Sequence, residues 1–244
     1  MPCLRACRLF IAAATLLLPA SAIAQTPDQK PQQRTWLQRF LGIKPDYSGG
    51  WLYVGYKNSS RDGLYFAVSK DGSVWKTINF DRPVLSQEQR NELMRDPFIQ
   101  RAPDGSFRLL WTWSTDPAII GYSTSTDLIH WTQQRPLPIA RLLPTATSVA
   151  TPATYYNPKQ KDWLLLFTAT SPSESSNHIY ASTTADFKQF QPAKPFVDQQ
   201  PASNAAAKIT SPTGLGHGSL LHLETSEYNL LLNYHGMDDS ALDK

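Results

Sequence analysis

The sequence predicts an all-β protein, a β-propeller built from four-stranded antiparallel blades. Three segments align without gaps and share an aspartate at the eighth position and an aromatic residue at the twelfth: LYFAVSKDGSVW at 64–75, IGYSTSTDLIHW at 120–131 and IYASTTADFKQF at 179–190. Alternating side chains that end in a polar turn are typical of a β-hairpin. A second strand pattern precedes each copy, at 51–57, 107–114 and 162–170. Two hairpins that recur at this period indicate propeller blades.

The last part of the chain raises the question of how the propeller closes. Residues 220–236, LLHLETSEYNLLLNYHG, begin what reads as a fourth unit, and the sequence ends at Lys244. Propellers usually have four to eight blades. We therefore expect about four blades, with the N-terminal segment completing the last one or with the sequence being a fragment of a larger propeller.

The N-terminal residues predict export from the cytoplasm. Arg5 and Arg8 form a basic start, residues 9–18 an apolar centre, and 22–24 an A-x-A cleavage signal. We expect a signal peptide at 1–24, because the apolar centre is too short for a membrane anchor. Residues 25–47 are expected to form a flexible leader with a short amphipathic helix at 34–43, and 48–244 the propeller domain. The predicted location is secreted or periplasmic.

Composition excludes several classes of function. Both cysteines, Cys3 and Cys7, lie in the predicted signal peptide, so no disulfide and no cysteine-bound metal is expected in the mature chain. The formal net charge of +3 falls towards neutrality once Arg5 and Arg8 are removed. This balance argues against a nucleic-acid partner. We also expect no membrane association after signal cleavage, and a monomer.

Three segments carry a family resemblance by their order and spacing. They read RDPFIQRAPDGSFRLLWTW at 95–113, IGYSTSTDLIHWTQQRPLPI at 120–139 and TPATYYNPKQKDWLLLFTAT at 151–170. Together they resemble successive blades of the five-bladed propellers of glycoside hydrolase family 43, and the similarity runs from about residue 51 to 197. The resemblance implies an acidic funnel at the propeller centre, where the innermost strands begin. It also implies inverting hydrolysis of plant-type glycans such as arabinan or xylan, by a carboxylate base and a carboxylic acid.

By this resemblance Asp96 is the general base. Pro97 would fix the backbone beside it, and Arg95 would help to keep the carboxylate ionised. The alternative is structural, with Arg95 and Asp96 forming an ion pair or capping the edge of a blade.

The proton donor is harder to find in the sequence. Ala153 stands where relatives carry a glutamate in the third blade, and residues 216–219, GHGS, occupy the place of a further aspartate. The remaining candidate donors are Asp116, Glu174, Asp198 and Glu224. We expect the other conspicuous aspartates to be structural turn residues, namely Asp71, Asp104, Asp127 and Asp186.

Aromatic residues suggest how a sugar would be held. Trp111, Trp113, Tyr155 and Tyr156 follow predicted inner strands and could stack on sugar rings, the alternative being core packing between blades. Strand alternation should send one of two adjacent residues to the core and the other away from it. His217 could face the funnel and bind a sugar hydroxyl or a metal-bound water. No cofactor is expected, although the centre could hold a structural metal ion.

Three hypotheses follow from these features. The first is a secreted glycoside hydrolase that acts on an oligosaccharide or polysaccharide. The second is a propeller that binds carbohydrate without hydrolysing it, as the missing acidic residues suggest. The third is a protein-interaction propeller, which the absence of kelch and WD signatures disfavours.

Overall fold

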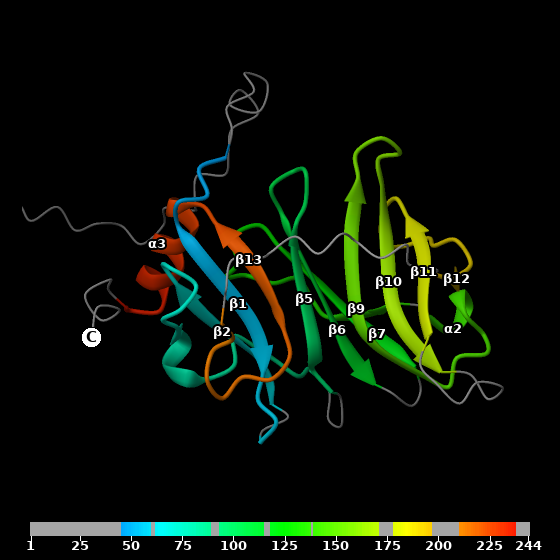
Figure 1. Ribbon diagram of the computed structural model, residues 1–244, viewed down its shortest axis with the longest axis horizontal. Helices are drawn as coiled ribbons and strands as arrows, with labels where there is room; N and C mark the ends of the chain where they lie inside the picture. The colour runs from blue at the N-terminus through cyan, green and yellow to red at the C-terminus, as the bar shows by residue number, and fades with distance from the viewer. Residues whose placement is uncertain are drawn as a thin grey trace, which may run out of the picture.

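The described part of the chain forms three antiparallel β-sheets that stand side by side (Figure 1). The computed structural model describes residues 45–59, 62–88, 93–114, 118–137, 139–170, 178–196 and 210–237. The predicted signal peptide and the helix expected at 34–43 lie outside these ranges. Within them, no helix is both long and apolar enough to cross a membrane.

The second and third sheets are complete blades, each formed by one continuous stretch of chain. The second sheet has the order β5 (Arg95–Arg101), β6 (Phe107–Ser114), β7 (Ile119–Ser125), β8 (Arg135–Leu137). The third has the order β9 (Ser148–Asn157), β10 (Asp162–Thr170), β11 (His178–Thr184), β12 (Lys194–Pro195). A short helix, α2 (Ile139–Leu142), lies between them in the chain. The hairpins expected from the repeat, β6 with β7 and β10 with β11, are confirmed.

The first sheet combines strands from both ends of the described chain. Its order is β13 (Ser219–Leu223), β1 (Gly50–Tyr56), β2 (Gly63–Ser69), β3 (Lys76–Thr77). A further short strand, β4 (Leu85–Ser86), also pairs with β2. The short 3-10 helix η1 (Asn79–Asp81) lies between β3 and β4 in the chain. β13 pairs antiparallel with β1, with Leu221 opposite Leu52. The C-terminal segment therefore supplies the innermost strand of the first blade.

The expectation that 220–236 begins a separate fourth unit was wrong, whereas the expectation that the N-terminal segment completes the last blade is confirmed, because β1 and β2 lie in one sheet with β13. After β13 the chain forms a helix, α3 (Thr225–Tyr234), that contacts β1 and β13. Tyr228, Leu231 and Leu232 are buried, at a spacing that puts them on one helix face. Glu224 and Glu227 form a capping box at the first turn. The apolar run that suggested a strand is the buried face of a capped helix.

The arrangement is that of β-propeller blades, as predicted, with three blades in the described residues. The innermost strands are β13, β5 and β9, and β5 contacts both of the others. The arrows of β13 and β9 point the same way in Figure 1. The entrances of the inner strands therefore gather at one end of the molecule.

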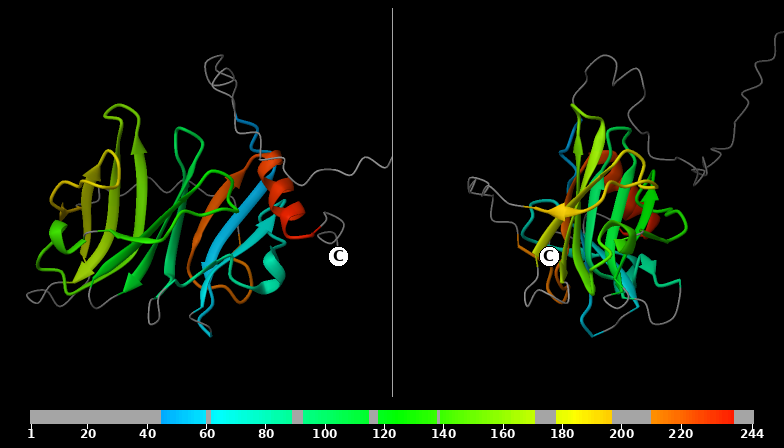
Figure 2. Two further views of the ribbon diagram at one scale, coloured as in Figure 1. Left: turned by 180° about the vertical axis from the view of Figure 1, so that it is seen from behind. Right: turned by 90° about the vertical axis from the view of Figure 1, so that its right-hand side faces the viewer.

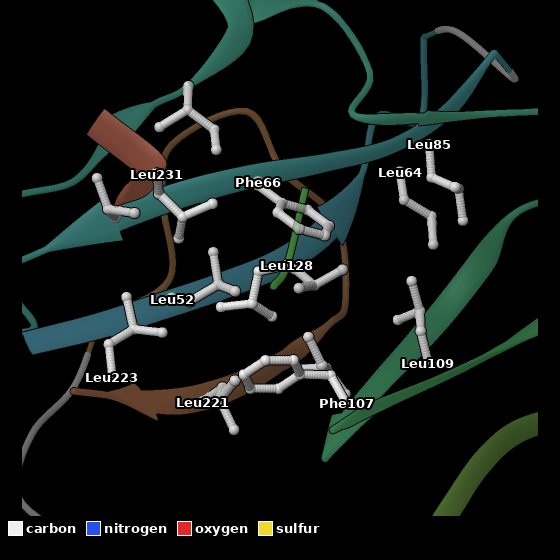
Figure 3. Packing of buried hydrophobic residues seen from close by; sticks show 14 of the residues in the cluster. Leu52, Leu64, Phe66, Leu85, Phe107, Leu109, Leu128, Leu221, Leu223 and Leu231 are labelled. Carbon is white, nitrogen blue, oxygen red and sulfur yellow. The ribbon is translucent and has the colours of Figure 1, made fainter. Parts of the chain in front are cut away.

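Two apolar clusters hold the three blades together. The first lies between the first and second sheets, where Leu52 and Phe66 face Phe107 and Leu109, with β13 and α3 adding leucines (Figure 3). The second lies between the second and third sheets and includes Leu110, Leu165 and Phe187. Figure 2 shows the same row of blades from behind and along its length. The residues of the core are thus shared between neighbouring blades rather than enclosed within one.

The repeated aspartates are turn residues, as expected. Each aspartate carboxylate accepts hydrogen bonds from the backbone N–H groups two and three residues later. The hydroxyl of the residue two positions before the aspartate accepts the N–H of the residue directly after the aspartate. These residues are Asp71, Asp127 and Asp186 with Ser69, Ser125 and Thr184. The residue after each aspartate has a positive φ, of 78° at Gly72, 68° at Leu128 and 59° at Phe187. Asp104 accepts two similar bonds from Ser106.

An ion pair joins the far end of β5 to α3. Arg101 Nη2 donates to Glu227 Oε2 at 2.6 Å, and Nη1 donates to Oε1. Both side chains are mostly buried, at 14% and 11% exposure. Glu227 Oε2 also accepts the Glu224 N–H of the capping box at 2.8 Å. One carboxylate thus ties the helix that follows β13 to the second blade.

We predict that Glu227→Gln destabilises the protein by about 3 kcal/mol, because it leaves the buried guanidinium without its opposite charge. Urea unfolding followed by tryptophan fluorescence measures the change. The matched control is Asp81→Asn, which removes a carboxylate 57% exposed in its pair with Lys57 and should cost at most about 1 kcal/mol. Equal losses in the two variants would contradict this account of the Arg101 pair.

Acid should weaken the three hairpin turns together. Hydrogen bonds from Ser73 and Val74 lower the pKa of Asp71, and those from the Gln189 and Lys188 N–H groups lower the pKa of Asp186. Burial would raise the pKa of Asp127, but hydrogen bonds led by the His130 side chain outweigh it and lower the pKa. A carboxyl with a lowered folded pKa stabilises the fold above its unfolded pKa of about 3.9, and this stability is lost as the pH falls through the folded pKa.

The measurement is the free energy of unfolding from pH 7 to pH 3, for wild type and for a variant with all three turn aspartates changed to asparagine. We expect the variant to lose less stability on acidification, because asparagine keeps the turn but does not titrate in this range. A variant whose stability falls as steeply as that of wild type would show that other groups cause the acid loss.

Candidate functional site

Asp96 lies at a backbone irregularity at the start of the inner strand β5. Its φ is 48°, an uncommon value for a residue other than glycine. The register of β5 on β6 shifts between Arg95, which faces Thr112, and Phe98, which faces Leu110. Backbone held in such a conformation often occurs at functional sites, where the surrounding fold stabilises the strain.

The third blade repeats this irregularity with a different side chain. Thr151 has a φ of 47° and is followed by a proline, as Asp96 is. Ala150 faces Thr168 and Ala153 faces Leu166, with the same shift between these pairs. The blade counterpart of Asp96 is therefore Thr151. Ala153, where relatives are expected to carry a glutamate, is the blade counterpart of Phe98.

Hydroxyl groups connect these two strand entrances. Thr112 Oγ1 donates to Asp96 Oδ2 at 3.3 Å and accepts the Thr151 N–H at 3.3 Å. Thr151 Oγ1 lies 2.9 Å from Thr168 Oγ1, which donates to the Ala150 carbonyl oxygen at 3.1 Å. One carboxylate oxygen of Asp96 is thus held by a side chain that also bonds to the neighbouring blade.

His217 approaches the other oxygen of Asp96 from the first blade. Its Nδ1 atom lies 3.4 Å from Asp96 Oδ1, and the imidazole is 69% exposed whereas the aspartate side chain is 18% exposed. The entrance of β13 is packed tightly on β1, since a Cβ atom at Gly218 would lie 2.0 Å from the Val54 carbonyl oxygen. The Tyr53 hydroxyl donates to the Gly216 carbonyl oxygen at 2.7 Å. Glycines on both sides of His217 therefore allow the close approach that places the imidazole over Asp96.

The structure places Arg95 against an aromatic ring. Its guanidinium lies 5.7 Å from the centre of the Tyr56 ring on β1, a cation–π distance. Arg95 thus connects the entrance of β5 to the first blade. His217, which the sequence analysis selected separately from Arg95 and Asp96, lies with them at one place.

Trp111 and Trp113 belong to the core, which corrects their assignment as sugar-binding residues. Trp111 is 0% exposed and Trp113 is 6% exposed. Their rings stack with centres 5.9 Å apart within the cluster between the first and second sheets. They lie two positions apart on β6, so strand alternation places both on the same face. Their ring faces are covered by protein.

Tyr155 and Tyr156 separate as alternation predicts. Tyr155 is 49% exposed, and its ring meets that of Phe98 edge-on at 5.7 Å. Tyr156 packs against Trp163 at 5.1 Å, at the edge of the second apolar cluster. Of the four proposed aromatic contacts, Tyr155 presents the most accessible ring.

Of the four candidate proton donors, the structure describes Glu224, which does not reach the site. Glu224 is the N-cap residue of α3, at the opposite end of β13 from His217. Asp116, Glu174 and Asp198 lie outside the described residues. Within the described ranges of the chain, no group of three or more histidine, cysteine, aspartate or glutamate side chains is arranged to hold a metal ion.

The site is thus a partly exposed carboxylate at the entrance of an inner strand of a β-propeller blade. The model of the family described as "Probable glycosyl hydrolase domain", related to glycoside hydrolase family 43, matches residues 46–219. The chain therefore belongs to this family. No curated protein matches it.

Several solved structures are similar to the chain. They include an exo-beta-1,3-galactanase from Phanerochaete chrysosporium (18% identity, TM-score 0.35, 41% of this chain and 25% of that one). The chain is also similar to an alpha-L-arabinofuranosidase from Clostridium thermocellum (14% identity, TM-score 0.38, 62% of this chain and 52% of that one). A further similar structure is an arabinanase from Bacillus subtilis (19% identity, TM-score 0.34, 57% of this chain and 54% of that one). The matched part spans from about a quarter to about half of the length of these structures.

Truncating an aromatic residue should lower the free energy of unfolding strongly in the core and only slightly at the surface. We expect Trp111→Ala to destabilise the protein by about 3–5 kcal/mol, because it removes a fully buried ring. Tyr155→Ala should change stability by less than about 1 kcal/mol and weaken the binding of oligosaccharides. Denaturant unfolding and calorimetric titration measure the two effects. Comparable losses of stability in both variants would contradict the assignment of Tyr155 to the surface.

Proposed function

We propose that the protein hydrolyses glycosidic bonds at the centre of the propeller, with Asp96 supplying the negative charge that activates the attacking water. The observation that carries this proposal is the position of Asp96 at the entrance of an inner strand, with Thr112 donating to one of its oxygens and His217 lying 3.4 Å from the other. Membership of a family of glycosyl hydrolase domains supports the reaction class. Inverting chemistry is part of the proposal and comes from the resemblance to family 43.

The residues around Asp96 predict weak assistance to the leaving group. An inverting enzyme places a carboxylic acid roughly 6.5–9.5 Å from the base carboxylate. Among the described residues, the adjacent blades present Thr151 and His217 at the strand entrances, and neither is a carboxylic acid. General acid catalysis contributes roughly 10²- to 10⁴-fold, and poor leaving groups depend on it most. The proposed substrates that react fastest are therefore glycosides with activated leaving groups.

The natural substrate that we propose is a plant-type glycan with arabinose or xylose units, and the proposed location is secreted or periplasmic. The exposed ring of Tyr155 supports contact with a sugar, because aromatic faces accept the C–H faces of sugars. Cell fractionation with an antibody tests the location: the expected result is mature protein outside the cytoplasm, and retention of full-length protein in the cytoplasm would contradict it.

The central test compares aryl and alkyl arabinosides and xylosides as substrates. We expect kcat/KM for aryl glycosides to exceed that for alkyl glycosides by far, and Asp96→Asn to lower kcat on aryl glycosides by about 100-fold or more. Sugar binding should survive the substitution. The matched control is Asp104→Asn, because Asp104 lies in a turn at the opposite end of β5. This variant should hydrolyse aryl glycosides at the wild-type rate. Equal rates for Asp96→Asn and wild type would remove Asp96 from the reaction.

A second candidate function is carbohydrate binding without hydrolysis. The observation that favours it is the threonine at the blade position equivalent to Asp96. Calorimetric titration with xylo- and arabino-oligosaccharides separates the two functions: binding by a protein that hydrolyses no aryl glycoside would establish the second one.

A further inference from the structure

We propose that His217, rather than Asp96, takes the proton from the attacking water, and that Asp96 acts by fixing the tautomer of the imidazole. This inference rests on the proposed function of the same site. It concerns which of the two side chains contacts the water.

The order of the two groups from the surface inward supports this assignment. The imidazole is 69% exposed and lies over a carboxylate that is 18% exposed. A substrate that enters from solvent therefore meets the histidine first. Asp96 Oδ1 faces His217 Nδ1 and Oδ2 accepts from Thr112, so both carboxylate oxygens already face protein groups.

The atoms that meet also define the roles. A carboxylate next to Nδ1 favours the tautomer with a proton on Nδ1 and leaves Nε2 as the proton acceptor. The same relation holds in catalytic triads, where the buried aspartate orients the histidine and the imidazole moves the proton. The separation of 3.4 Å is longer than a good hydrogen bond, and such contacts often tighten only when substrate binds.

The remaining groups near His217 do not compete for this role. Arg95, at the entrance of β5, is held over the Tyr56 ring. The Tyr53 hydroxyl donates to the Gly216 carbonyl oxygen. The Tyr56 ring lies against Gly216, where a Cβ atom would be 2.9 Å from it. From the third blade, Thr151 contributes a hydroxyl that is bonded to Thr168. In the part of the chain that the structure describes, Asp96 is thus the carboxylate that lies against the imidazole.

The proposed step balances without a further reactant. A water molecule bonds through its oxygen to the anomeric carbon and gives one proton to His217 Nε2. The bond from that carbon to the leaving oxygen breaks, and its electron pair stays on the leaving oxygen. An aryl oxide leaves as the anion and later takes a proton from water, and the imidazolium returns its proton to solvent.

The test uses His217→Asn, because the asparagine amide can still donate to Asp96 but has no atom in place of Nε2. We expect kcat on aryl glycosides to fall by about 100-fold or more, and Asp96→Asn/His217→Asn to be no slower than the slower single variant. The matched control is His130→Asn. His130 Nδ1 lies 2.8 Å from Asp127 Oδ2, and the imidazole is 74% exposed. This pair resembles the His217–Asp96 pair but lies in a hairpin turn, so His130→Asn should leave kcat unchanged.

The pH profile and the tautomer give readouts that a merely structural role would not move. We expect His217→Asn to shift the acidic limb of the kcat/KM profile, because the group that accepts the proton sets the position of that limb. Nitrogen NMR of the imidazole, assigned through His217→Asn, should show the Nδ1–H tautomer in wild type and a mixture in Asp96→Asn.

The outcomes distinguish this inference from the proposed function. Hydrolysis by His217→Asn at a rate close to wild type, with an unchanged acidic limb, would overturn the inference and leave Asp96 as the direct base. A dominant Nε2–H tautomer in wild type would also overturn it. Wild-type protein without activity on any aryl glycoside would overturn the proposed function, and the base role with it.

Discussion

The pairing of β13 with β1 is the interaction on which the rest of the structure depends. It joins residues 219–223 to 50–54 and so makes the C-terminal segment the inner strand of the first blade. Leu221 and Leu223 then enter the cluster between the first and second sheets, beside Leu52. The same pairing places α3 where Glu227 reaches Arg101 at the end of β5. Both ends of β5 are therefore contacted by the segment that contains β13.

The candidate site is a consequence of that pairing. Asp96 belongs to the second blade, but the imidazole that approaches it comes from the loop that leads into β13. The close packing of Gly218 against Val54 sets the position of this loop. From the other side, Thr151 is bonded to the same Thr112 that holds Asp96. All three blades thus contribute residues to a site that no single blade could form.

The sequence predicted the features that depend on local patterns. The repeated aspartates and strand alternation gave the hairpins, the turns and the separation of Tyr155 from Tyr156. Completion of the last blade by the N-terminal segment was one of two alternatives left open, because β13 and β1 are far apart in the chain and their pairing leaves no local pattern. The helix α3 was missed although Glu224 and Glu227 have capping-box spacing, since the leucine run between 230 and 232 also suits a strand. Trp111 and Trp113 were misassigned because alternation gives their shared face, but only the packing of blades decides that this face is the core.

The most direct measurement is a crystal structure of the Asp96→Asn variant with an arabino- or xylo-oligosaccharide, in which turnover is slowed. We expect β13 on β1 as the inner strand of the first blade, and a sugar ring in contact with the His217 imidazole above residue 96. A glycan bound away from the entrances of β13, β5 and β9, or a β13 that does not pair with β1, would contradict the site and the function proposed for it.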